Sequence, residues 1–208
     1  MLGITVMGRL RRQGLTEIFF ESAEPPFESD DPDEVTLLPE DFFRRFPPGT
    51  YEVEGRTLDH RELESELELT HVMPAPPEVE VNGTPMAEEC DEEEDDYDAP
   101  VVVAPVVISW DPVTLSHPDP DGGGAGVQPP VAVEIHNYEI VVEIELEIDG
   151  EEFTSVMHAV LPPDLTSFAI PDDFLGQGDT FKYEVLAREE SYNQTAVESC
   201  FLLADAGD

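Results

Sequence analysis

The chain of 208 residues carries 49 acidic and nine basic side chains, which gives a formal net charge of −40. A surface of this sign excludes nucleic-acid binding, because phosphate is bound by clustered cations, and it disfavours anionic membrane surfaces. The apolar content of 40% is that of a globular protein. The length suits one large domain or two small ones, and we favour two.

Two explanations account for the acidic excess. Adaptation to high salt is the first, because concentrated counterions screen carboxylates over a few ångströms and so relieve their mutual repulsion. The second is that some of the carboxylates bind Ca²⁺, an ion that is coordinated by Asp and Glu oxygens. We favour the first explanation and keep weak calcium binding as the alternative.

No stretch of the sequence is typical of a targeting or membrane segment. The apolar residues 2–7 are too short for the core of a signal peptide, and no run approaches the roughly 20 residues of a membrane-spanning helix. We therefore expect no membrane insertion. Cys90 and Cys200 are the only cysteines, so a disulfide framework is excluded and a single bridge between them is left open.

Residues 1–73 are predicted to form a small β-rich unit with one short helix. The first predicted strand of this unit is at 15–20, and the helix follows it. The helix has Pro39 in its first turn and Arg44 and Arg45 in its last turn, the charge order that suits the helix dipole. Two consecutive prolines at 47 and 48 end it.

A β-hairpin is predicted after the helix. Apolar and polar residues alternate strictly over 51–57 and 63–69, on either side of a turn at Asp59 and His60. One face of this hairpin is lined by glutamate. Because a two-stranded hairpin with one helix is marginal by itself, we expect either that the unit is incomplete at its N-terminus or that residues 1–20 complete a small sheet.

Residues 74–98 are predicted to be a linker. The segment 73–77 is rich in proline, which resists both helix and central strand. The stretch 88–98 then has nine carboxylates in eleven residues and cannot bury enough apolar surface to order itself. We expect it to be a solvated tether.

Residues 99–208 read as a β-sandwich of seven short strands. One hairpin is predicted from the alternating strand 138–148, a two-residue turn at Asp149 and Gly150 and a return strand at 153–160. The long glycine-rich loop 115–130 is expected to be functional or disordered.

Three stretches of this unit resemble a fibronectin type III domain. They are Ile108-Ser-Trp110, similar to its second strand, Tyr138-Glu-Ile140-Val-Val142, similar to its third, and the Gly-rich turn and alternating strand 175–187, similar to its sixth. The resemblance covers about 99–204, but Phe181 stands where the family usually has the tyrosine of a tyrosine corner. It implies a sandwich in a bacterial or archaeal multidomain protein, with six core residues: Trp110, Tyr138, Ile140, Val142, Phe181 and Val185.

The sequence indicates no catalytic, cofactor-binding or metal-binding residue. It contains no nucleophile elbow, phosphate loop, zinc spacing or dinucleotide fingerprint. The run His117-x-Asp119-x-Asp121-Gly122 imitates the start of a calcium loop, but Gln128 stands where a bidentate glutamate is required. We therefore predict no cofactor.

Two tripeptides fit the pattern for N-glycosylation, Asn82-Gly-Thr84 and Asn193-Gln-Thr195. Without a known host they are interpreted as coincidental.

The leading hypothesis is a non-catalytic binding or spacer module of a secreted or cell-surface protein, as the resemblance implies. Its partner would be an unknown protein or glycan, and its location extracellular or periplasmic. One alternative is a small carboxylate-based hydrolase or hydrolase accessory domain, which a cleft with two carboxylates of raised pKa would favour. The other is a calcium-dependent adhesion module, which ordered Ca²⁺ at 119–121 or in the linker would favour.

Overall fold

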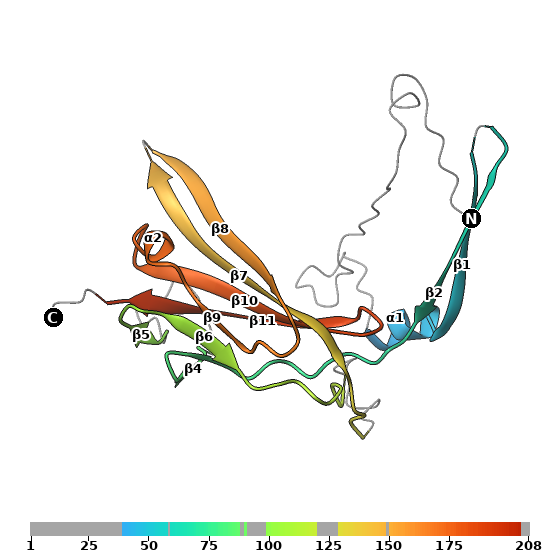
Figure 1. The fold of residues 1–208 in the computed structure, drawn as a ribbon, viewed down its shortest axis with the longest axis horizontal. Helices are drawn as coiled ribbons and strands as arrows, with labels where there is room; N and C mark the ends of the chain where they lie inside the picture. Colours follow the sequence, from blue (N-terminus) through green and yellow to red (C-terminus); the bar gives the residue numbers. More distant parts are fainter. Residues whose placement is uncertain are drawn as a thin grey trace, which may run out of the picture.

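The computed structural model describes residues 39–57, 59–87, 90, 99–119, 129–148 and 150–204. The predicted strand at 15–20, the acidic stretch 91–98 and most of the loop 115–130 lie outside these residues. The described part of the chain is mainly β, as the sequence predicts, with only two short helices (Figure 1). Neither helix combines the length and the apolar character needed to span a bilayer.

The predicted helix and hairpin are confirmed. Helix α1 spans Pro39–Arg45, and strands β1 (Gly49–Arg56) and β2 (Glu62–Leu69) pair antiparallel in a two-stranded sheet. His60 takes a positive φ of 66° in the turn between them, a conformation that single residues adopt in tight turns. The hydroxyl of Tyr51 donates to the carbonyl oxygen of Pro47 at 2.9 Å and so ties the helix exit to the hairpin.

The remaining strands form two sheets. The larger has the order β5-β11-β10-β7-β8, from strands Val101–Val102, Gln194–Leu203, Thr180–Glu189, Ile135–Ile148 and Glu151–Leu161. The smaller has the order β4-β3-β6-β9, from strands Thr84–Pro85, Val79–Val81, Val107–Trp110 and Ser167–Ala169. The short helix α2 (Asp172–Leu175) lies between β9 and β10 in the chain.

Side chains from both sheets share one hydrophobic core, which is compatible with a β-sandwich. All six core residues predicted from the sequence are buried. The rings of Phe181 and Phe201 stack with centroids 5.0 Å apart, and those of Trp110 and Tyr138 meet edge to face at 5.3 Å. The Tyr138 hydroxyl accepts a hydrogen bond from the backbone N–H of Val113 at 2.9 Å, which satisfies its polar end inside the core.

Residues 79–85 of the predicted linker 74–98 pair within the sandwich, which differs from the expectation of a linker over that whole range. Strand β3 pairs with β6, and its side chains Val79 and Val81 are buried in the core. These valines alternate with Glu78 and Glu80, a strand pattern that the neighbouring prolines concealed. The two sheets therefore hold nine strands where the sequence predicted seven.

The apolar stretch 101–103 forms a strand over only two of its residues. It is the two-residue edge strand β5, which runs parallel to β11 with Val101 opposite Leu202. Strand β5 therefore lies in the larger sheet. In the smaller sheet the strands beside β6 are β3 and β9.

The structure forms the bridge that the sequence left open, a disulfide between Cys90 and Cys200. Cys200 is fully buried on β11, where it packs with Ala87 and Ala99. The described residues that flank the acidic stretch, Ala87, Cys90 and Ala99, therefore all lie against β11.

Candidate functional site

The outer face of the larger sheet carries a group of neighbouring ionisable side chains. Alternation along β7 sends its apolar residues into the core and Glu139, Glu143 and Glu145 outward. The antiparallel register places Lys182 on β10 opposite Glu143, and Glu184 opposite Glu198 on β11. A charged surface therefore follows directly from the strand pattern that builds the core.

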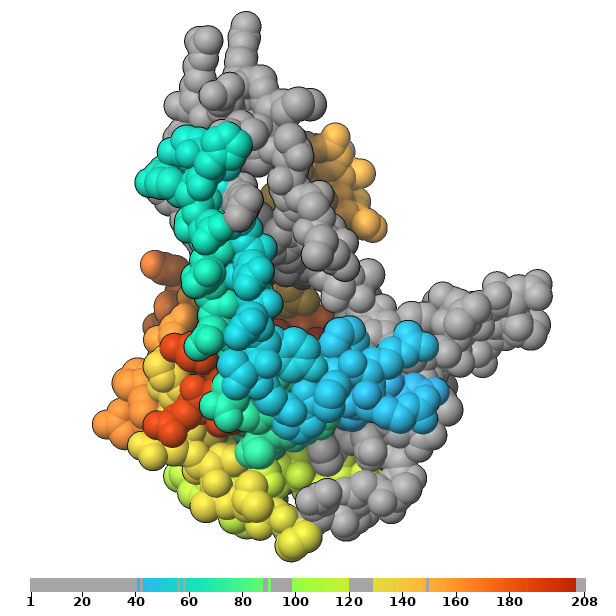
Figure 2. Space-filling view, turned by 90° about the vertical axis from the view of Figure 1, so that its right-hand side faces the viewer, coloured from blue at the N-terminus to red at the C-terminus, as the bar shows by residue number. Residues whose placement is uncertain are grey.

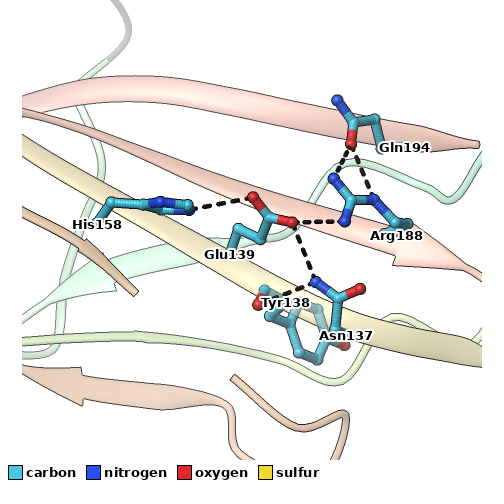
Figure 3. A network of polar contacts seen from close by, with 6 residues as sticks. All are labelled: Asn137, Tyr138, Glu139, His158, Arg188 and Gln194. Atoms are coloured by element: carbon cyan, nitrogen blue, oxygen red, sulfur yellow. Dashed lines mark hydrogen bonds and ion pairs between the residues drawn. The ribbon is translucent and has the colours of Figure 1, made fainter. Parts of the chain in front are cut away.

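A polar network on this face is centred on Glu139 (Figure 3). Its carboxylate accepts from Arg188 Nη1 at 2.6 Å and from Asn137 Nδ2 at 3.3 Å, and its other oxygen lies 3.1 Å from His158 Nε2. Arg188 in turn donates from Nε and Nη2 to Gln194 Oε1 at 3.1 and 2.8 Å. The network joins the adjacent strands β11, β10, β7 and β8. The Glu139 side chain is only 14% exposed, so its hydrogen bonds are made in a partly desolvated setting.

Glu184 lies among further carboxylates on the same face. Partial burial raises the pKa of Glu184, and the nearby carboxylates of Glu198, Glu139 and Glu143 raise it further, while His158 lowers it. Both main causes disfavour a negative charge at this position. The Glu184 carboxyl therefore holds its proton to a higher pH than an ordinary glutamate.

An open hollow lies beside the disulfide on this face. It is lined by Cys90, Glu143, Lys182, Glu184 and Glu198 among others. Its charged side chains could bind a polar or cationic group, and a carboxyl of raised pKa could donate a proton. The hollow is open to solvent, so it lacks the water exclusion that strengthens electrostatic catalysis.

The motif that imitates a calcium loop is described only in part. The His117 ring accepts a hydrogen bond from the backbone N–H of Asp119 at 3.0 Å, whereas Asp121 and Gln128 lie outside the described residues. Within the ranges that the structure describes, no three His, Cys, Asp or Glu side chains are grouped as metal ligands would be. Calcium binding stays a prediction.

Both tripeptides that fit the glycosylation pattern have structural roles. Asn193 Nδ2 donates to the carbonyl oxygens of Thr70 and Val72 at 3.0 and 2.9 Å, and Thr195 Oγ1 donates to that of Pro74 at 2.7 Å. These bonds attach the segment that follows β2 to the turn between β10 and β11 and to the start of β11. Figure 2 shows the helix and hairpin beside that end of the sandwich. Sequence reasoning missed this role because it depends on residues more than a hundred positions away.

Asn82 has a comparable role on the smaller sheet. Its Nδ2 donates to the carbonyl oxygens of Val103 and Pro105 at 3.0 and 3.1 Å, and its Oδ1 accepts from the backbone N–H of Val107 at 2.8 Å. The side chain thus satisfies the backbone of the segment that enters β6.

Comparison with known proteins does not assign the chain to a family. No family model matches it, and no curated protein is significantly similar in sequence.

Proposed function

We propose that this chain is a non-catalytic binding or spacer module of a secreted or cell-surface protein, built on a fibronectin type III-like sandwich with a surface suited to high salt. The observation that carries the proposal is the disulfide between Cys90 and Cys200. Disulfides persist in oxidising compartments outside the cytosol and are rare inside it. A bridge between the only two cysteines of the chain is therefore typical of an exported protein.

The strand order supports the fibronectin type III-like part of the proposal. Without the two-residue strands β4 and β5, the two sheets hold seven strands. Trp110 then lies on the second of these, Tyr138 on the third and Phe181 on the sixth, in agreement with the resemblance drawn from the sequence. This fold serves many unrelated binding and spacing roles, so it favours a module without naming a ligand.

Pairs of carboxylates that face each other across strands support the high-salt part. Four such pairs lie directly opposite in the antiparallel registers: Glu52 and Glu66, Glu54 and Glu64, Glu147 and Glu152, and Glu184 and Glu198. Like charges in directly opposite positions destabilise a sheet. Their cost falls when salt screens them, which favours an environment of high ionic strength.

The location is tested by the redox state of the cysteines in the source cells. Free thiols are blocked at lysis, the culture medium, cell surface and cytosol are separated, and peptides containing Cys90 and Cys200 are measured by mass spectrometry. We expect the disulfide-linked peptide pair in the medium or surface fraction. Blocked free thiols, in protein found only in the cytosol, would contradict the proposal.

One observation favours the hydrolase alternative, namely the raised pKa of Glu184 beside other carboxylates. A glycosidase needs one protonated and one ionised carboxyl group that flank the scissile bond. The alternative is tested with a panel of chromogenic glycosides, on the wild type and on Glu184→Gln. Turnover by the wild type that Glu184→Gln abolishes would replace the non-catalytic proposal, and equal absence of turnover supports it.

A further inference from the structure

The two sheets of the sandwich have four edge strands, and three of them are very short. Strands β4 and β5 have two residues each and β9 has three, whereas β8 has eleven. Among the residues that the structure describes, only β7 pairs with β8, so its other edge carries unpaired backbone N–H and C=O groups (Figure 1). Short edges are a usual protection against pairing with other chains, and β8 lacks it.

After Glu151 and Glu152, strand β8 also lacks acidic residues, lysine, arginine and proline, the other usual protections of an edge. Residues 153–161 contain no Asp, Glu, Lys or Arg, in a chain in which 28% of residues are charged. The pairing with β7 is regular from Glu151 to Leu161, without a bulge that would turn the edge away. Two valines next to the edge are also exposed, Val156 by 54% and Val160 by 61%.

We propose that β8 pairs antiparallel with β8 of a second copy of this chain, about a two-fold axis that passes between the two Met157 residues. In this register the run 153–161, which has no Asp, Glu, Lys or Arg, pairs with the same run of the second copy. Phe153, which is 47% exposed, then lies opposite the partner's Leu161, and Val156 lies opposite the partner's His158. Opposed residues are an even number of positions apart, so core-facing side chains meet core-facing side chains.

The distribution of charge along β8 fits a second copy at this edge, since the pairing can be made without facing carboxylates. Two chains of net charge −40 repel each other wherever carboxylates approach, and the uncharged run is where contact costs least. In the proposed register Glu151 and Glu152 lie opposite the partner's Pro163 and Pro162, so no carboxylate meets a carboxylate. Nine paired residues would exchange about eight to ten backbone hydrogen bonds. The inference goes beyond the proposed function because the ligand is the chain itself.

The register is tested by engineered cysteines in the full chain at about 1 M KCl, where the Debye length is about 3 Å. Directly opposed residues have Cα atoms about 4.5–5.5 Å apart, which a disulfide can span. We expect Met157→Cys to form a covalent dimer on oxidation. Ser155→Cys and Ala159→Cys should not crosslink alone but should crosslink when mixed, because residues 155 and 159 oppose each other across the axis. Crosslinking of Ser155→Cys alone as efficiently as Met157→Cys would overturn the register.

The edge itself is tested by sedimentation velocity over a range of protein concentrations. The double variant Val156→Lys and Val160→Lys places cations opposite Glu143 and Glu139 within one chain, which does not destabilise the monomer. Lysines on an edge strand oppose its pairing with another chain. We expect the dimer dissociation constant to rise at least about tenfold, the equivalent of about 1.4 kcal/mol. Melting temperature and circular dichroism establish that the variant is folded.

The matched control is Val101→Lys together with Val103→Lys, which makes the same charge change at exposed valines in and after β5. It should leave the dissociation constant within about twofold, since it lies on another edge. An equal effect of both double variants would overturn the proposal. A wild type that stays monomeric into the millimolar range at high salt would overturn it as well.

Discussion

Removal of the Cys90–Cys200 bridge should lower the free energy of unfolding by several kcal/mol. The cysteines are 110 residues apart, and closing a loop of about 100 residues removes chain entropy worth about 4.7 kcal/mol from the unfolded state. Cys90→Ala deletes only a half-buried sulfur and leaves the buried Cys200 in place, so little native packing is lost. We expect a loss of about 3–5 kcal/mol, a large share of the roughly 5–15 kcal/mol that stabilises a domain.

The assay is urea unfolding followed by tryptophan fluorescence. Trp110 is the only tryptophan and is 4% exposed in the core, so its emission reports the sandwich. Reductant should lower the midpoint of the wild type to that of Cys90→Ala and leave the variant unchanged. A loss below about 1 kcal/mol in both cases would refute the reasoning, because the bridge would then add almost nothing to constraints already present in the unfolded chain.

Three further changes test the core, the junction and the charged face. Trp110→Ala should cost about 3–5 kcal/mol in the same unfolding assay, because a large buried side chain leaves a cavity, and a loss well under 1 kcal/mol would place Trp110 at the surface. Asn193→Ala should cost about 1–2 kcal/mol in thermal unfolding, since it removes the donors to Thr70 and Val72, and an unchanged melting temperature would contradict that role. The raised pKa of Glu184 means that the native state binds this proton more tightly than the unfolded state, so its contribution to stability falls as pH rises from the ordinary glutamate range through the folded pKa. Glu184→Gln should remove that fall in a pH series of melting temperatures, and parallel pH curves for the two proteins would contradict it.

Local alternation was sufficient to predict the longer strands, including the hairpin of β1 and β2, in which nearly all described side chains are exposed on both faces. The hairpin of β1 and β2, the long pair β7 and β8, and the buried positions on β10 all follow from a period of two in apolar residues. Strand β3 was missed because it has three residues and lies among prolines. At that length, the side-chain pattern is too brief to outweigh the local signals that favour a loop.

The features of the candidate site depend on register, which a single sequence does not specify. Glu139 and Arg188 were each predictable as outward residues of a strand, but their ion pair requires β7 and β10 to be neighbours with a particular alignment. The disulfide requires the chain to return to β11 between residues 87 and 99. Such contacts are set by the packing of the whole sandwich, so the spacing of residues along the chain does not predict them.

The facing carboxylates lead to a last prediction, which separates screening from specific ion binding. If Glu52, Glu54 and their partners on β2 only repel each other, the melting temperature should rise smoothly between about 0.1 M and 1 M salt, as the Debye length falls from about 10 Å to about 3 Å, and NaCl and KCl should act alike. If carboxylates bind Ca²⁺ specifically, millimolar calcium at constant ionic strength should raise the melting temperature to a plateau, because a ligand of the native state adds RT ln(1 + [L]/Kd). Mg²⁺ should not reproduce that plateau, since it requires strict octahedral geometry. We expect the smooth monovalent response, because repulsion between facing glutamates needs no ordered ion to relieve it. A saturating, calcium-selective rise would instead favour the adhesion module.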